Sequence, residues 1–182
     1  MKGSPSTYPT FLVVGLLSGI ASGVSVAIPP LGLFCPPVFF GVAICCAFHA
    51  TQTPISFWQC VLLICVSVVA FFSAVIGAML AVRLPGFDNG FLGGGRSGAI
   101  AGGIGSFLIA LGLIVIVEDS KPVASLPIMT LAGSVLGVVF AVLGIALSDH
   151  PACGHPLDDL VIFPIWQAGV ALTIPLFRRN SP

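Results

Sequence analysis

Six apolar segments, separated by short polar gaps, make up almost the whole chain. About 20 helical residues rising roughly 1.5 Å each cross the roughly 30 Å hydrocarbon core of a bilayer, and most of these segments reach that length. Every charged residue lies in a gap or at a chain end. The pattern predicts an all-α bundle of transmembrane helices that forms one integral membrane domain over residues 1–182. The expected spans are 11–28, 31–50, 57–82, 97–117, 126–147 and 160–177.

The second segment, Leu31–Ala50, has the least certain path across the membrane. Pro36 and Pro37 interrupt it, and a proline inside a helix removes a backbone hydrogen bond and crowds the preceding turn. Only residues 38–50 are free of proline, which is short for a full crossing. The sequence therefore leaves two topologies open, one with six spans and one with five spans and a re-entrant second segment.

The distribution of lysine and arginine favours six spans. Loops that face the cytoplasm carry an excess of these residues, so the topology with the larger imbalance is preferred. Five spans would place three cationic residues on each side. Six spans place both termini in the cytoplasm and divide the residues unequally, with Lys2, Lys121, Arg178 and Arg179 on one side and Arg83 and Arg96 on the other.

Composition supports the same class of protein and limits its partners. Only 7% of the 182 residues are charged and the mean hydropathy is +1.16, which is too apolar for the exterior of a soluble domain. The formal net charge is zero, so no attraction to nucleic acid is expected. The expected partners are the lipid bilayer and other membrane subunits or further copies of the chain.

Glycines at four-residue intervals, in the Gly-x-x-x-Gly pattern, mark three of the predicted helices. Residues four apart share one helical face, and small side chains let membrane helices approach closely. We therefore expect grooves for helix packing, either within the chain or against another subunit. The glycines are Gly15, Gly19 and Gly23 in the first segment, Gly98 and Gly102 in the fourth, and Gly133 and Gly137 in the fifth.

One polar loop, residues 149–159, holds a dense group of potential metal ligands. Imidazole, thiolate and carboxylate groups could bind zinc, copper or iron, although the spacing matches no structural zinc pattern. Cys153 could instead form a disulfide with Cys35, which the six-span topology places on the same side. These two hypotheses compete, and a solvated polar loop is the simpler alternative. The candidate ligands are Asp149, His150, Cys153 and His155.

The predicted spans offer little chemistry of their own. None contains Asp, Glu, Lys or Arg, which usually mark proton and ion paths inside membranes. Gln59 and Gln167 are their strongest polar groups, and both lie near a predicted end. No catalytic constellation or nucleotide-binding loop is present, so no enzyme activity is expected. The sequence requires no cofactor, and a metal ion in the polar loop is the sole candidate.

Two short features bear on transport. Trp58-Gln59 recurs as Trp166-Gln167 in a helix of opposite direction, as inverted repeats of transporters do. Anchoring of tryptophan at the headgroup level is the simpler explanation. The run Gly93–Gly95 is expected to form a flexible connection that could gate a path.

Two functions from different classes remain open. The first is a non-catalytic subunit that packs through its glycine-striped helices into a larger membrane complex or a homo-oligomer. The second is a small transporter or channel for a neutral or weakly polar solute. The sequence favours the first by a small margin, because no polar groups are expected to converge at mid-membrane depth, where carriers bind their substrates.

Overall fold

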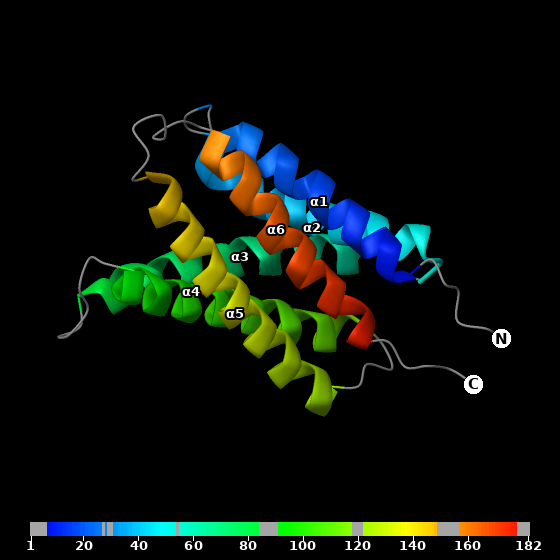
Figure 1. Ribbon diagram of the computed structural model, residues 1–182. Helices are drawn as coiled ribbons and strands as arrows, with labels where there is room; N and C mark the ends of the chain where they lie inside the picture. The colour runs from blue at the N-terminus through cyan, green and yellow to red at the C-terminus, as the bar shows by residue number, and fades with distance from the viewer. Residues whose placement is uncertain are drawn as a thin grey trace.

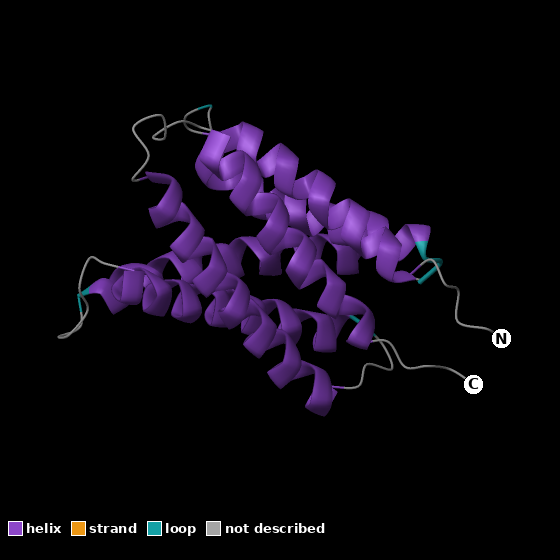
Figure 2. Cartoon of the chain, viewed as in Figure 1, coloured by secondary structure: helices purple, strands orange, loops and turns teal. Residues whose placement is uncertain are grey.

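Six α-helices make up most of the residues that the computed structural model describes, and these residues contain no strand (Figure 1, Figure 2). The described residues are 7–26, 28, 31–53, 55–83, 91–117, 122–148 and 157–177. The all-α prediction is confirmed. The helices are α1 (Thr7–Val26), α2 (Leu31–Ala50), α3 (Phe57–Val82), α4 (Phe91–Ile116), α5 (Pro122–Ser148) and α6 (Leu157–Thr173), and the short 3-10 helix η1 (Ile174–Phe177) follows α6.

The helices are those of a multi-pass membrane protein. Four of them, α1, α3, α4 and α5, contain stretches long and apolar enough to cross a bilayer. Shorter apolar stretches occupy Phe34–Ala50 in α2 and Phe163–Leu176 in α6 and η1. The second segment is one helix of 20 residues that continues through Pro36 and Pro37, without a reversal of direction. Its length, about 30 Å, matches the hydrocarbon core.

The helices α2 and α3 have the expected bounds, whereas α1, α4, α5 and α6 begin three to six residues earlier than expected. The fourth helix begins at Phe91, so Gly93–Gly95 is helical and the expected flexible connection there is wrong. Gly93 and Gly95 are buried, and Gly95 faces Val138 and Val142 of α5 within ordinary contact distance. Packing against α5 therefore outweighs the poor helix propensity of three glycines, which is a local tendency of about 1 kcal/mol each.

Each helix packs against its neighbours in chain order, and α6 closes the arrangement by packing against α1. The most extensive contacts join α4 to α5 and α1 to α6, followed by α3–α4 and α1–α2. Contacts of α2 with α3, and of α5 with α6, are less extensive. The bundle therefore consists of two three-helix groups, α1/α2/α6 and α3/α4/α5, which lie on opposite sides in Figure 1.

One half of the bundle holds nearly all of its large, fully buried side chains. This half, which we call the packed half, contains the beginnings of α1, α3 and α5 and the ends of α2, α4 and α6. Phe11 and Phe48 meet there edge to face with ring centroids 5.4 Å apart. Every helix contributes to its core. The largest members are Phe11, Ile44, Phe48, Leu63, Ile109, Leu113, Ile116, Met129, Val170 and Ile174.

Candidate functional site

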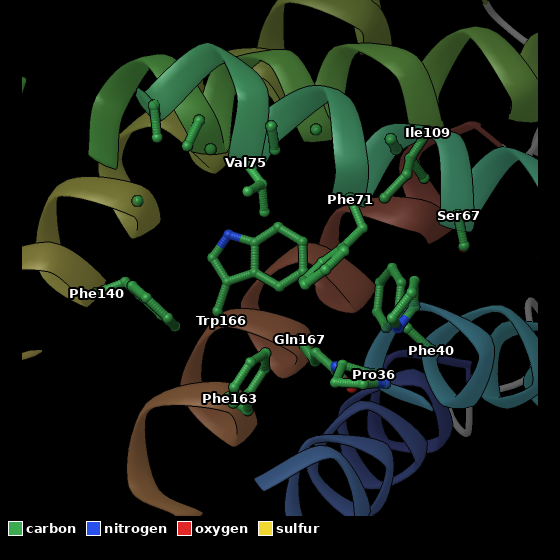
Figure 3. Close-up of a pocket in the computed structure, with 18 of the residues that line it drawn as sticks. Pro36, Phe40, Ser67, Phe71, Val75, Ile109, Phe140, Phe163, Trp166 and Gln167 are labelled. Carbon is green, nitrogen blue, oxygen red and sulfur yellow. The ribbon is translucent and has the colours of Figure 1, made fainter. Parts of the chain in front are cut away.

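A cavity of about 420 Å³ extends from the middle of the bundle into the other half, which we call the hollow half. Five helices, α2 to α6, contribute to its lining (Figure 3). It therefore lies between the two three-helix groups, where their contacts are least extensive. A volume of several hundred Å³ and a mostly apolar lining are typical of sites for small molecules.

Small residues form one wall of the cavity. Ala70, Ala74 and Ala78 lie four residues apart on one face of α3, and Gly105 of α4 lies against the first two. A Cβ atom added to Gly105 would be 3.5 Å from the Cβ of Ala74 and 3.8 Å from the carbonyl oxygen of Ala70. The helices are thus already in contact here, and the short side chains leave the adjoining space open.

Aromatic rings form the opposite wall. Trp166 of α6 projects into the space between α6 and α3, with Phe71 and Val75 facing it (Figure 3). Its ring packs against Phe40 of α2, with centroids 5.9 Å apart. Phe140 and Phe163 pair at the same centroid distance. The Trp166 ring reaches the small-residue wall, because its Cζ2 atom is 3.9 Å from where a Cβ atom on Gly105 would be.

Gln167 is the most polar side chain in the cavity lining, and its amide bonds to α1. The Oε1 atom accepts a hydrogen bond from Ser18 Oγ at 2.6 Å, and Nε2 donates to Ser22 Oγ at 2.9 Å. Ser22 Oγ in turn donates to the carbonyl oxygen of Ser18 at 2.8 Å. Gln167 is only 1% exposed. The amide therefore joins α6 to α1 instead of adding polarity to the cavity surface.

The depth of Gln167 differs from the expected one. The sixth helix begins at Leu157 and continues through η1 to Phe177, which places Gln167 midway along it. Three polar side chains, Ser18, Ser22 and Gln167, therefore meet in the interior of the bundle, whereas Gln167 was expected near a helix end. The reason is that α6 extends beyond its apolar run to include Asp158 and Asp159.

The glycines of α1 bring this helix close to α6. A Cβ atom added to Gly15 would lie 2.8 Å from the Cα atom of Ala168, and one added to Gly19 would overlap Pro164. Gly23 is also buried. This approach lets two serine side chains on α1 reach the amide of Gln167.

The glycines of α4 and α5 lie against each other. A Cβ atom on Gly98 would overlap the carbonyl oxygen of Gly137, and one on Gly102 would overlap that of Gly133. Ser106 packs against Gly133 in the same crossing. The glycine faces of both helices are thus in contact within the chain, along one border of the cavity.

The structure also contains two buried hydroxyl groups without a hydrogen-bond partner. Within the part of the chain that it describes, these are Ser67 Oγ and Ser106 Oγ. Ser67 lines the cavity, whereas Ser106 lies at the crossing of α4 and α5.

The predicted ligands of the polar loop lie outside the described residues. These are Asp149, His150, Cys153 and His155, so the metal hypothesis stays a prediction. The Cys35–Cys153 disulfide stays one for the same reason, with Cys35 half-buried in α2. Among the residues that are described, no three His, Cys, Asp or Glu side chains form a group that could hold a metal ion.

The two Trp-Gln pairs have different surroundings. Trp58 is 75% exposed at the start of α3. Gln59 forms a capping box with Ser56 and donates from Nε2 to the carbonyl oxygen of Ile116 at 2.8 Å. Trp166 and Gln167 lie in the middle of α6 instead. Their depths do not correspond, which favours anchoring as the explanation for Trp58 over an inverted repeat.

Sequence reasoning missed the cavity, although part of the signal was present. Ala70, Ala74 and Ala78 have the same four-residue spacing as the glycine stripes. Trp166 is near the centre of its helix, an unusual depth for an interfacial anchor. The rest of the cavity depends on which helix faces pack against each other, and the sequence of a single helix does not indicate this. No protein-family model, curated protein or solved structure matches this chain, so its function has to be inferred from the cavity itself.

Proposed function

We propose that the protein is a small membrane transporter or channel for a neutral solute, and that the solute binds in the cavity between the two three-helix groups. One observation carries this proposal, namely the 420 Å³ cavity at mid-helix depth to which five of the six helices contribute. Carriers commonly bind their substrates near the bilayer midplane, between bundles that move relative to each other. The less extensive α2–α3 and α5–α6 contacts are where such movement is expected.

The lining indicates the charge of the solute. Among the residues that the structure describes, no Asp, Glu, Lys or Arg belongs to it, and the Gln167 amide is already bonded to Ser18 and Ser22. An ion in an apolar site without a partner loses hydration that nothing replaces. The solute is therefore uncharged and mainly apolar.

The apolar lining of the cavity favours an apolar occupant. The pocket is partly open to the surface of the bundle, so lipid chains or an apolar solute can reach its apolar lining. An apolar molecule that fills part of the space recovers dispersion contacts with the aromatic wall. A resting occupant from the bilayer and a transported solute would compete for the same space.

The difference in packing between the two halves indicates the side from which the solute enters the cavity. The packed half is closed by large side chains from all six helices, whereas the cavity extends into the hollow half. The excess of lysine and arginine favours cytoplasmic termini, which puts the packed half on the cytoplasmic side. The solute then enters from the non-cytoplasmic side or leaflet.

The alternative role, a subunit of a membrane complex or homo-oligomer, ranks second. Its main argument was the glycine stripes, and Gly15, Gly19, Gly98 and Gly102 pack against helices of the same chain. An assembly would have to use another surface. Mass measurement of the intact particle in gentle detergent separates the two roles, because a stoichiometric partner favours the subunit.

A cavity-filling variant tests the proposal. Ala74→Phe places a ring in the cavity, and Ala146→Phe adds the same ring at an exposed position of α5 outside the lining. Ethylnaphthalene, a neutral apolar probe, is titrated into protein in nanodiscs, with empty nanodiscs as the blank for isothermal titration calorimetry. We expect one site in the wild type and in Ala146→Phe, and at least roughly tenfold weaker binding in Ala74→Phe, because the added ring occupies the site. Equal binding by both variants, or none in the wild type, would contradict the proposal.

A further inference from the structure

Trp166 places an indole N–H group in the lining of the cavity. The residue is partly exposed near the middle of α6, and its ring projects between α6 and α3 (Figure 3). Its nitrogen lies on the edge of the ring that points away from Phe71 and Phe40 (Figure 3). The Cζ2 atom, on the same edge, is 3.9 Å from where a Cβ atom on Gly105 would be. The nitrogen edge of the ring therefore faces the small-residue wall.

This N–H group has no hydrogen-bond partner in the part of the chain that the structure describes. The contact of Trp166 with Phe40 is one between rings. Phe71 and Val75, which face the indole, have no acceptor atom. The adjacent Gln167 uses its Oε1 atom to accept from Ser18. Carbonyl oxygens within the surrounding helices accept from N–H groups of their own helix. The indole donor is thus free for an acceptor that the chain does not supply.

The indole nitrogen is within reach of a molecule in the cavity, unlike the two unpartnered serine hydroxyls. Among the described residues, packing seals Ser67 Oγ and Ser106 Oγ away from any contact. Ser67 lies at the close crossing of α2 and α3, with its Oγ atom 3.3 Å from where a Cβ atom on Gly41 would be. The nitrogen of Trp166 is not sealed in this way, because the ring projects into the open space.

Water is a poor partner for this group. A buried tryptophan N–H usually has a hydrogen-bond partner. A water molecule in an apolar cavity needs about two to four polar partners to stay there, and the described lining offers it the indole donor while the Gln167 amide is already bonded. An organic molecule with one acceptor atom needs a single donor, and its hydrocarbon part is at home against the aromatic wall.

We propose that Trp166 Nε1 donates a hydrogen bond to the bound molecule. The substrate class is then an uncharged, mainly hydrocarbon or aromatic molecule that carries one carbonyl-type acceptor, such as a ketone, an ester or a quinone. The indole acts as a specificity determinant, because a substrate without an acceptor leaves its N–H unpaired. This inference rests on the proposed function, since it assumes that the cavity binds a solute.

A matched pair of probes tests the inference. Acetylnaphthalene and ethylnaphthalene have nearly the same shape, but only the former carries a carbonyl acceptor. Their dissociation constants are measured by calorimetry in nanodiscs for the wild type, Trp166→Phe and Trp58→Phe, with thermal unfolding as a check on folding. Trp58→Phe is the same change at an exposed residue outside the lining. The ratio of the two constants within one variant isolates the acceptor, because a change in cavity volume affects both probes alike.

We expect the wild type and Trp58→Phe to bind the ketone roughly three- to tenfold more tightly than the hydrocarbon, and Trp166→Phe to bind both equally, because one neutral hydrogen bond is lost. If Trp166→Phe does not fold or binds neither probe, 3-benzothienylalanine at this position keeps the ring shape, replaces only the N–H by sulfur and is expected to abolish the preference. A preference that survives removal of the N–H, or is missing from the wild type, overturns this inference while the cavity stays a binding site. Failure of both probes to bind the wild type overturns the proposed function as well.

Discussion

The two halves of this bundle are both apolar, but they pack differently. In the packed half, large aliphatic and aromatic side chains from all six helices interdigitate. In the hollow half, alanines and a glycine on α3 and α4 face aromatic rings that pack on one another, and space remains between the walls. Lipid provides little hydrophobic force that would close this space, so the shapes of the side chains decide whether a membrane core is filled.

In the hollow half, glycine and alanine differ in how closely they let neighbouring helices approach. Gly98 and Gly102 let α4 touch the backbone of α5, so the helices meet along the border of the cavity. Ala74 and Ala78, at the same four-residue spacing, leave space at the centre. A small-residue stripe thus brings two helices together when it faces another small stripe, and it leaves a cavity when it faces a rigid ring.

Truncation of a phenylalanine should give the largest difference between the halves. Phe48→Ala in the packed half is expected to lower the free energy of unfolding by about 3–5 kcal/mol, because it leaves a new void. Phe163→Ala, whose ring borders existing space, should cost about half as much. Unfolding by denaturing detergent in mixed micelles measures both. Equal costs would show that the hollow half is as well filled as the packed half.

Enlargement of an alanine should give effects of opposite sign. Ala110, which is fully buried in the packed half, has no room for a larger side chain, so Ala110→Leu is expected to cost about 1–3 kcal/mol. Ala74→Leu extends into the cavity and should raise the unfolding free energy by up to about 1 kcal/mol. Both values come from the same unfolding experiment. Destabilisation by Ala74→Leu comparable to that of Ala110→Leu would argue against open space at this wall.

The two glutamines allow a smaller comparison. Gln167→Leu removes the bonds to Ser18 and Ser22 that join α6 to α1, and we expect a loss of about 1–2 kcal/mol in unfolding free energy. Gln59→Leu removes its capping role and its bond to Ile116 near a helix end, which should cost about 0.5–1 kcal/mol. A larger effect at Gln59 would contradict the assigned depths.

The two tryptophans should report the smallest effect, a spectroscopic one. In Trp58→Phe, emission comes from Trp166 at the cavity and should be blue-shifted; in Trp166→Phe it comes from the exposed Trp58 and should lie at longer wavelength. Addition of ethylnaphthalene should quench Trp166 strongly and Trp58 weakly. Identical spectra and quenching for the two variants would be inconsistent with these positions.

Much of the fold could be predicted from the sequence, because the length of an apolar run is a local property that the bilayer thickness makes decisive. The helical class follows from it, as do most helix boundaries. The predictions were wrong where the tertiary structure outweighed a local sequence tendency. Gly93–Gly95 is helical because it packs on α5, and Gln167 is central because α6 extends back to Leu157.

The sequence by itself determined that the chain forms apolar helices, that charge is absent from the apolar runs and that small residues recur at helical spacing. Only the tertiary structure decided which small faces close and which leave a cavity, because that depends on the residues opposite them on distant helices.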